Sequence, residues 1–114
     1  VEKVVVSDLA RSDMAEVIED AFRYDRMVVA APTYDAGLFP VMEDFLNHLK
    51  AKNYSNRKVG IVENGTWAPM AAKKMTEILA TLKNVTLAET VVTVKSTLSA
   101  DSEAAMDKLV QELV

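Results

Sequence analysis

Two short runs of apolar residues constrain the fold of this 114-residue chain more than any other feature. Residues 27–30 read MVVA and residues 59–62 read VGIV, without alternating polar residues. A strand buried on one face alternates, whereas a strand of a parallel sheet is buried on both faces and reads as a continuous apolar run. The two runs therefore predict central strands of a parallel β-sheet.

Stretches with helical periodicity separate the predicted strands. The expected strands span residues 1–7, 26–31, 58–62 and 85–94. The expected helices begin near Asp13, Pro40, Pro69 and Ser99. Aspartate and serine cap helices, and a proline fits the first turn because its missing N–H has no helical partner there. Strict alternation predicts a three-layer αβα fold of four βα units, with a parallel sheet and helices on both faces.

Composition excludes several classes of function. The net charge of −4 disfavours a nucleic-acid or anionic membrane surface. The sequence has no apolar run of about eighteen residues, which a membrane-spanning helix needs. Without cysteine it can form no disulfide, no thiolate metal site and no cysteine nucleophile. We therefore expect a cytoplasmic protein that binds neither nucleic acid nor membranes.

The segments that follow the two apolar runs carry the candidate binding residues. The first reads APTYDAGLFP over residues 31–40, and the second reads ENGTWAP over residues 63–69. Each holds one aromatic residue, one glycine and a proline that opens the next helix. Ligands of open parallel sheets bind where the strands end. Tyr34 and Trp67, on neighbouring loops at that edge, therefore suggest a flat ring held between them.

The candidate ligand-binding residues of the two segments are Pro32, Thr33, Tyr34, Asp35, Ala36, Gly37, Asn64, Gly65, Thr66 and Trp67. Structural alternatives remain open for several of them. Tyr34 could cover the edge of the core, Trp67 could be buried at a helix start, and Thr66 could cap that helix. Asp35 and Glu63 could form an acid–base pair, but nothing fixes their separation, so solvated loop carboxylates are the preferred interpretation.

The sequence offers no catalytic or metal-binding signature. Its one histidine, His48, is expected on a helix surface, and a histidine-rich metal site needs a second. Neither of the common glycine-rich phosphate loops nor a nucleophile elbow is present. We assign no catalytic residue and no metal ligand.

Taken together, three stretches resemble the flavodoxin-like domain of flavodiiron (A-type) flavoproteins. Residues 7–13 (SDLARSD) resemble its second strand and the following helix start. Residues 31–35 with 39–40, and residues 63–69, resemble the FMN loops after its third and fourth strands. The resemblance covers residues 1–114 and implies strand order 2-1-3-4-5, with FMN at the carboxyl edge. It further implies electron transfer to a redox partner protein or a diiron domain, in an enzyme that reduces oxygen or nitric oxide.

The chain departs from that family at its beginning. It starts one βα unit late, so we expect a single domain over residues 1–114 that lacks the first strand and its phosphate-binding loop. Hydrogen bonds to charged groups contribute about 1.5–3 kcal/mol each, so this fragment is expected to bind FMN weakly or not at all. The missing central strand also predicts a homodimer in which residues 1–24 are exchanged between chains.

Two other classes of function are compatible with an α/β chain. A receiver-like signalling module would need an acidic cluster at strand ends, for which Asp8 and Asp35 are candidates, and Lys95 follows the last strand. A non-catalytic assembly module would pair its sheet with another chain. The two aromatic loops have no role in a receiver-like module, and an assembly role suits the fragment but not its parent protein, so the flavin-binding interpretation is preferred.

Overall fold

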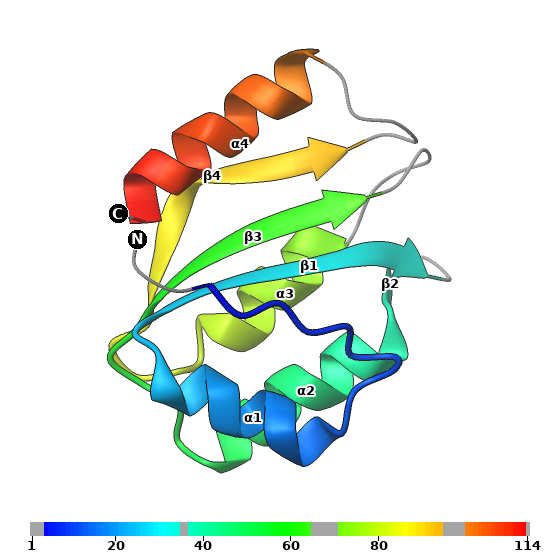
Figure 1. The fold of residues 1–114 in the computed structure, drawn as a ribbon, viewed down its shortest axis with the longest axis vertical. Helices are drawn as coiled ribbons and strands as arrows, with labels where there is room; N and C mark the ends of the chain where they lie inside the picture. The colour runs from blue at the N-terminus through cyan, green and yellow to red at the C-terminus, as the bar shows by residue number, and fades with distance from the viewer. Residues whose placement is uncertain (1–3, 35–36, 65–70, 95–99, 114) are drawn as a thin grey trace.

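The computed structural model describes residues 4–34, 37–64, 71–94 and 100–113 (Figure 1). Three parallel strands, β1 (Arg26–Tyr34), β3 (Lys58–Asn64) and β4 (Thr86–Val94), form its sheet. A two-residue strand, β2 (Gly37–Leu38), pairs antiparallel with the end of β1, which gives the order β2-β1-β3-β4. The predicted parallel sheet is therefore confirmed, with one short antiparallel addition.

Helices cover both faces of the sheet, as the alternation predicted. The helices α1 (Met14–Arg23), α2 (Pro40–Ala51) and α3 (Ala71–Leu79) lie on one face, and α4 (Ala100–Leu113) lies on the other (Figure 1). Asp13 caps α1 by accepting the Ala15 N–H, and Pro40 opens α2, both as predicted. Within the described ranges, no helix is long and apolar enough to cross a bilayer.

Each face of the sheet has its own hydrophobic cluster. The larger cluster joins β1 and β3 to the first three helices, and its fully buried members include Leu46, Leu49, Met75 and Leu79. The smaller cluster joins α4 to the other face around Val92, Leu109 and Leu113. The sequence periodicity had placed each of these helix residues on an inward face.

The segment before α1 differs from the prediction. Residues 4–8 have no secondary structure, although residues 1–7 were expected to form a strand. Val4 and Val6 are 72% and 88% exposed. A strand needs a neighbour that accepts and donates its backbone hydrogen bonds. No strand of the described sheet pairs with residues 4–8. The strand propensity of the valines alone was therefore not sufficient to form a strand.

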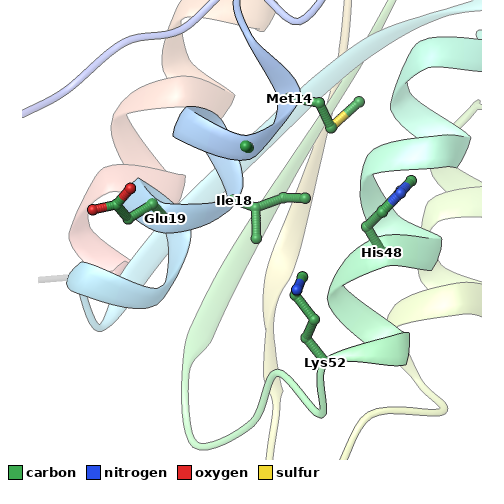
Figure 2. A pocket seen from close by; sticks show the side chains of 6 residues that line it. Met14, Ile18, Glu19, His48 and Lys52 are labelled. Carbon is green, nitrogen blue, oxygen red and sulfur yellow. The ribbon is translucent and has the colours of Figure 1, made fainter.

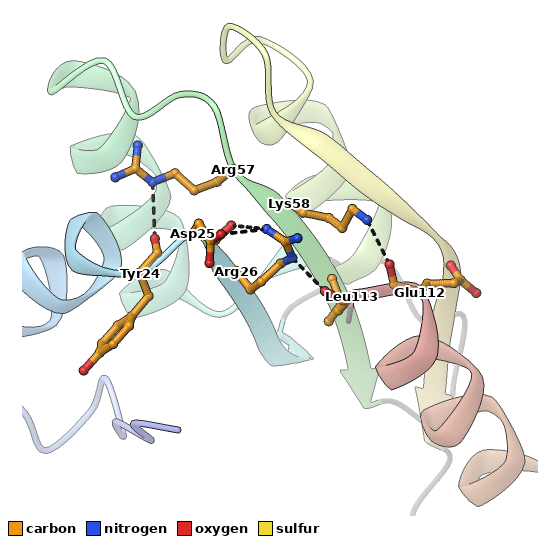
Figure 3. Close-up of polar contacts among 7 residues, drawn as sticks. All are labelled: Tyr24, Asp25, Arg26, Arg57, Lys58, Glu112 and Leu113. Atoms are coloured by element: carbon orange, nitrogen blue, oxygen red, sulfur yellow. Dashed lines mark hydrogen bonds and ion pairs between the residues drawn. The ribbon is translucent and has the colours of Figure 1, made fainter. Parts of the chain in front are cut away.

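The C-terminus of α4 is tied to the beginnings of β1 and β3. Arg26 Nε donates to the Leu113 carbonyl at 2.7 Å, and Lys58 Nζ donates to the Glu112 carbonyl at 3.1 Å (Figure 3). The last carbonyls of a helix lack partners within the helix and carry partial negative charge, which cations stabilise. These two contacts fix α4 at the end of the sheet opposite the candidate loops.

Tyr54 packs in the core beside a cation. It is fully buried, its ring meets the Phe22 ring edge-on at 5.2 Å between centroids, and the Arg57 guanidinium lies 4.9 Å from its centroid. Burial raises the pKa of the Tyr54 hydroxyl from 10.0 to about 12, against a smaller opposing effect of Arg57. The folded chain therefore favours the neutral phenol of Tyr54 over the phenolate.

We expect Tyr54 to make the fold sensitive to alkaline pH. Between pH 10 and 12 the unfolded chain loses the Tyr54 proton before the folded chain does, so stability is complete below pH 10 and falls as pH rises. Tyr54→Phe keeps the ring and removes this ionisation. Urea unfolding across that range should show a steeper loss of stability for wild type than for Tyr54→Phe, and equal slopes would contradict the expectation.

Candidate functional site

The candidate site lies where β1 and β3 end side by side. The register pairs Pro32 with Asn64, and Asn64 in turn with Val94 of β4, so all three parallel strands end at one edge (Figure 1). The segments that follow β1 and β3 therefore leave from neighbouring points. This is the edge at which parallel α/β sheets bind ligands.

The strands extend further into the predicted binding segments than expected. Pro32, Thr33 and Tyr34 belong to β1, and Asn64 is the last residue of β3. Gly37 belongs to β2. The other predicted site residues, Asp35, Ala36, Gly65, Thr66 and Trp67, lie outside the described residues, as do the expected helix starts at Pro69 and Ser99. The placement of Tyr34 against Trp67 thus stays a prediction.

β2 pairs with the end of β1 in the segment where the sequence predicted a loop. Tyr34 pairs with Gly37 and Thr33 pairs with Leu38, so the two strands are joined by residues 35 and 36 alone. Leu38 is buried, and α2 begins two residues later. The hairpin ties the first candidate segment to the sheet at both of its ends.

Pro32 lies within β1, and its missing backbone N–H removes no hydrogen bond to β3. The Lys58 N–H donates to the Asp25 carbonyl at 3.2 Å, and bonds between parallel strands use alternate residues. The backbone N–H and C=O groups of the odd-numbered residues of β1 therefore point toward β3. Those of the even-numbered residues point toward the opposite edge of the strand. A proline is tolerated where its nitrogen faces away from the neighbouring strand.

Glu63 is a buried carboxylate beneath this edge. Its side chain is 8% exposed, where the sequence favoured a solvated loop carboxylate. Its Oε1 accepts the Ala72 N–H at 3.1 Å, and its Oε2 accepts the Thr93 hydroxyl at 2.7 Å. Burial of a charge is costly unless hydrogen bonds compensate it, and these two bonds join β3 to α3 and β4.

Glu63 also limits what the start of α3 can bind. A helix N-terminus attracts anions through its free N–H groups and its dipole. Here a carboxylate of the chain itself already accepts the Ala72 N–H in the first turn of α3. A phosphate at this point would meet a like charge.

The role of Glu63 could have been predicted from strand alternation. Val59 and Ile61 point to the same face of β3 as Glu63, and both are buried. A carboxylate in phase with two buried residues indicates an internal hydrogen-bonding group. Thr93, its partner, carried no such signal, because the pairing between β3 and β4 is not visible in the sequence.

A shallow groove lies elsewhere, between α1 and α2. It has a volume of about 470 Å³, and its lining includes Met14 and Ile18 from α1 and His48 from α2 (Figure 2). The His48 Nδ1 lies 2.7 Å from the Asp44 carbonyl, which can only accept, so this nitrogen carries a proton. His48 is exposed, as expected, and the groove contains none of the predicted binding residues.

Comparison with known proteins shows the fold. No protein-family model and no curated protein matches the sequence. Rubredoxin:oxygen oxidoreductase from the anaerobe Desulfovibrio gigas is similar in structure, with a TM-score of 0.73 at 18% identity over 88% of this chain. An NADPH-quinone reductase from P. pentosaceus has a TM-score of 0.58 at 14% identity over 92% of this chain. The chain therefore has a flavodoxin-like α/β fold.

The matched length differs between the two structures. The chain spans 31% of the Desulfovibrio gigas protein and 76% of the quinone reductase. The three parallel strands of this chain follow the order expected for the last three strands of a flavodoxin-like sheet. The fold prediction is thus confirmed.

Proposed function

We propose that this chain is the FMN-binding electron-transfer domain of a flavodiiron-type oxygen or nitric oxide reductase. The observation that carries the proposal is the register of Pro32 with Asn64. It supports the proposal because the segments that follow β1 and β3 leave from neighbouring points of the edge at which parallel α/β sheets bind ligands. FMN, when bound there, would accept and pass on one or two electrons.

The charge at this edge favours the ring of FMN over its phosphate as the group bound there. Pro32 and Asn64 are exposed near the ends of their strands, and the Glu63 carboxylate already accepts the Ala72 N–H at the start of α3. An aromatic ring on each segment would add contacts to both faces of an isoalloxazine ring. A redox partner protein or a diiron domain would then receive the electrons.

The receiver-like alternative is less well supported. Asp8, one of its required acids, lies in the segment without secondary structure rather than at a strand end. The Asp8 carboxylate accepts the Ala10 N–H and pairs with Arg11 across 3.7 Å, both within its own turn. It is therefore used locally, while Asp35 and Lys95 lie outside the described residues.

The test is flavin binding by the full-length protein that contains this chain. We expect it to be purified yellow, or to become yellow on incubation with FMN. Trp67→Ala should raise the FMN dissociation constant about 5- to 150-fold, because stacking on an aromatic side chain contributes roughly 1–3 kcal/mol. Trp67→Phe, which keeps a ring, should retain most of the affinity.

Two results would contradict the proposal at different levels. Full-length protein without flavin absorbance after incubation with FMN would remove the proposed function. An unchanged dissociation constant in Trp67→Ala would leave the function in place and remove Trp67 from the site. Titration of the 114-residue chain alone should give markedly weaker binding than the full-length protein.

A further inference from the structure

The groove between α1 and α2 brings an apolar pair of side chains together with a polar pair. Met14 and Ile18 lie four residues apart on α1, and His48 and Lys52 lie four residues apart at the end of α2. Residues at this spacing share one face of a helix. Figure 2 shows the four side chains around one gap, whose volume is about 470 Å³. The groove therefore has an apolar wall and a polar wall.

The Lys52 ammonium supplies a positive charge that no ion pair neutralises. Among the described residues, the ion pairs nearest in the sequence of α1 join Arg23 to Glu19 and to Asp20, each across 3.5 Å, and none includes Lys52. Glu19 also lines the groove, but Figure 2 shows its carboxylate directed away from Lys52. An anionic group of a ligand would therefore meet an unpaired cation on the polar wall.

The hydrogen bond of His48 determines what its other ring nitrogen can bind. The Asp44 carbonyl lies 2.7 Å from Nδ1 and fixes the proton on that nitrogen. In the neutral ring Nε2 then carries a lone pair and accepts a hydrogen bond. No hydrogen bond between described residues occupies Nε2. The matching group of a ligand is a donor such as a hydroxyl, because a second carboxylate oxygen would only accept.

We propose that this groove binds a small aliphatic hydroxy acid. The carboxylate pairs with Lys52 Nζ, the hydroxyl donates to His48 Nε2, and the hydrocarbon chain lies on Met14 and Ile18. Side chains four residues apart on a helix have Cβ atoms about 5–6 Å apart, a span that suits a hydroxyl close to the carboxylate. The groove contains no residue of the candidate edge, so this inference is independent of the proposed flavin site.

The open shape of the groove sets the expected affinity. Sites that bind small molecules tightly bury most of the ligand surface, which a shallow groove does not do. We expect a dissociation constant of about 1 mM for an acid of about eight carbons. Each methylene group that is buried on the apolar wall should strengthen binding by up to about fourfold, so a short chain should bind much more weakly.

The first experiment varies the ligand and observes the groove directly. The full-length protein is labelled with carbon-13 at its methionine methyl groups, and the Met14 signal is assigned from its loss in Met14→Leu. Titration with 3-hydroxyoctanoate should shift this signal and reach saturation. Octanoate, which lacks the hydroxyl, should bind about 2- to 10-fold more weakly. The uncharged 1,3-octanediol and the short 3-hydroxybutyrate should each bind at least about tenfold more weakly.

The second experiment repeats the titration with matched variants of α2. Lys52→Met should raise the dissociation constant of 3-hydroxyoctanoate by about tenfold, whereas Lys52→Arg keeps the charge and should stay within about threefold of wild type. Lys50→Met is the control, since Lys50 is equally exposed on the same helix and does not line the groove. His48→Leu should bind octanoate like wild type and should lose the preference for the hydroxyl.

The results separate the parts of the proposal. A Met14 signal that shows no saturable shift, or equal affinities in Lys52→Met and Lys50→Met, would overturn it. Equal binding of 1,3-octanediol would show apolar adsorption only, and equal binding of octanoate in wild type would remove the hydroxy acid as the ligand; either would also overturn it. Circular dichroism checks that each exposed-residue variant is folded. None of these readouts involves flavin, so failure of the flavin assignment would leave the outcome at the groove unchanged.

Discussion

Replacing Gly60 with valine is expected to detach α4 from the sheet and to destabilise the chain by about 3 kcal/mol, the upper part of the usual range for overpacking. A Cβ at Gly60 would lie 2.9 Å from the Leu109 Cδ1 and 3.1 Å from the Leu113 Cδ1. Both leucines are buried against β3, and α4 is clamped at its end by Arg26 and Lys58. The helix therefore cannot move aside without losing these contacts.

The measurement is chemical denaturation of Gly60→Val beside a matched substitution on the same face. Ala30→Val adds the same kind of side chain to β1, whose residues 28 and 30 are exposed on the α4 face. No described helix covers that position, so Ala30→Val should change stability by less than about 0.5 kcal/mol. Equal stabilities for the two variants would show that the close packing at Gly60 carries no cost.

The regular part of the fold could be predicted because its signals are local or periodic. The apolar runs at residues 27–30 and 59–62 lie within β1 and β3. Asp13 and Pro40 were expected to start helices, and they lie at the starts of α1 and α2. The strand ends were placed too early, because residues 32–34 gain their partners from β2 and from Asn64. Those partners are a matter of register, which sequence periodicity does not specify.

The failure at residues 1–7 has the same physical origin. Val4, Val5 and Val6 have high strand propensity, but that propensity expresses fit to a neighbouring strand rather than a backbone preference. Glu63 shows the converse case. Its position in the segment that follows an apolar run suggested a loop, and only the pairing of β3 with β4 reveals that it has a hydroxyl partner in Thr93. Both differences from the prediction therefore depend on which strands pair, and pairing between strands distant in sequence is not visible in the local sequence.

β4 and the part of β1 before its pairing with β2 both have an edge with no described neighbouring strand, and the two edges differ. β4 is an irregular strand: its register with β3 shifts opposite Gly60, and the Glu112 carboxylate accepts the Thr90 N–H there. Irregularities in an edge strand are one of the usual protections of a natural edge. In β1 the N–H and C=O groups of Arg26, Val28 and Ala30 face away from β3, and no described strand pairs with them. Val28 is 51% exposed beside them.

We therefore expect the 114-residue chain to form dimers through the open edge of β1. An antiparallel pairing of two β1 strands about a two-fold axis is self-complementary, and an exchange of residues 1–24 would use the same edge. Light scattering at micromolar and higher concentrations should give the dimer mass. Ala30→Pro removes an N–H that faces the open edge and not β3, so it should give a folded monomer. Ala30→Val keeps that N–H and should remain dimeric. A monomer mass for wild type across the whole range, or a dimer of Ala30→Pro, would refute pairing at this edge.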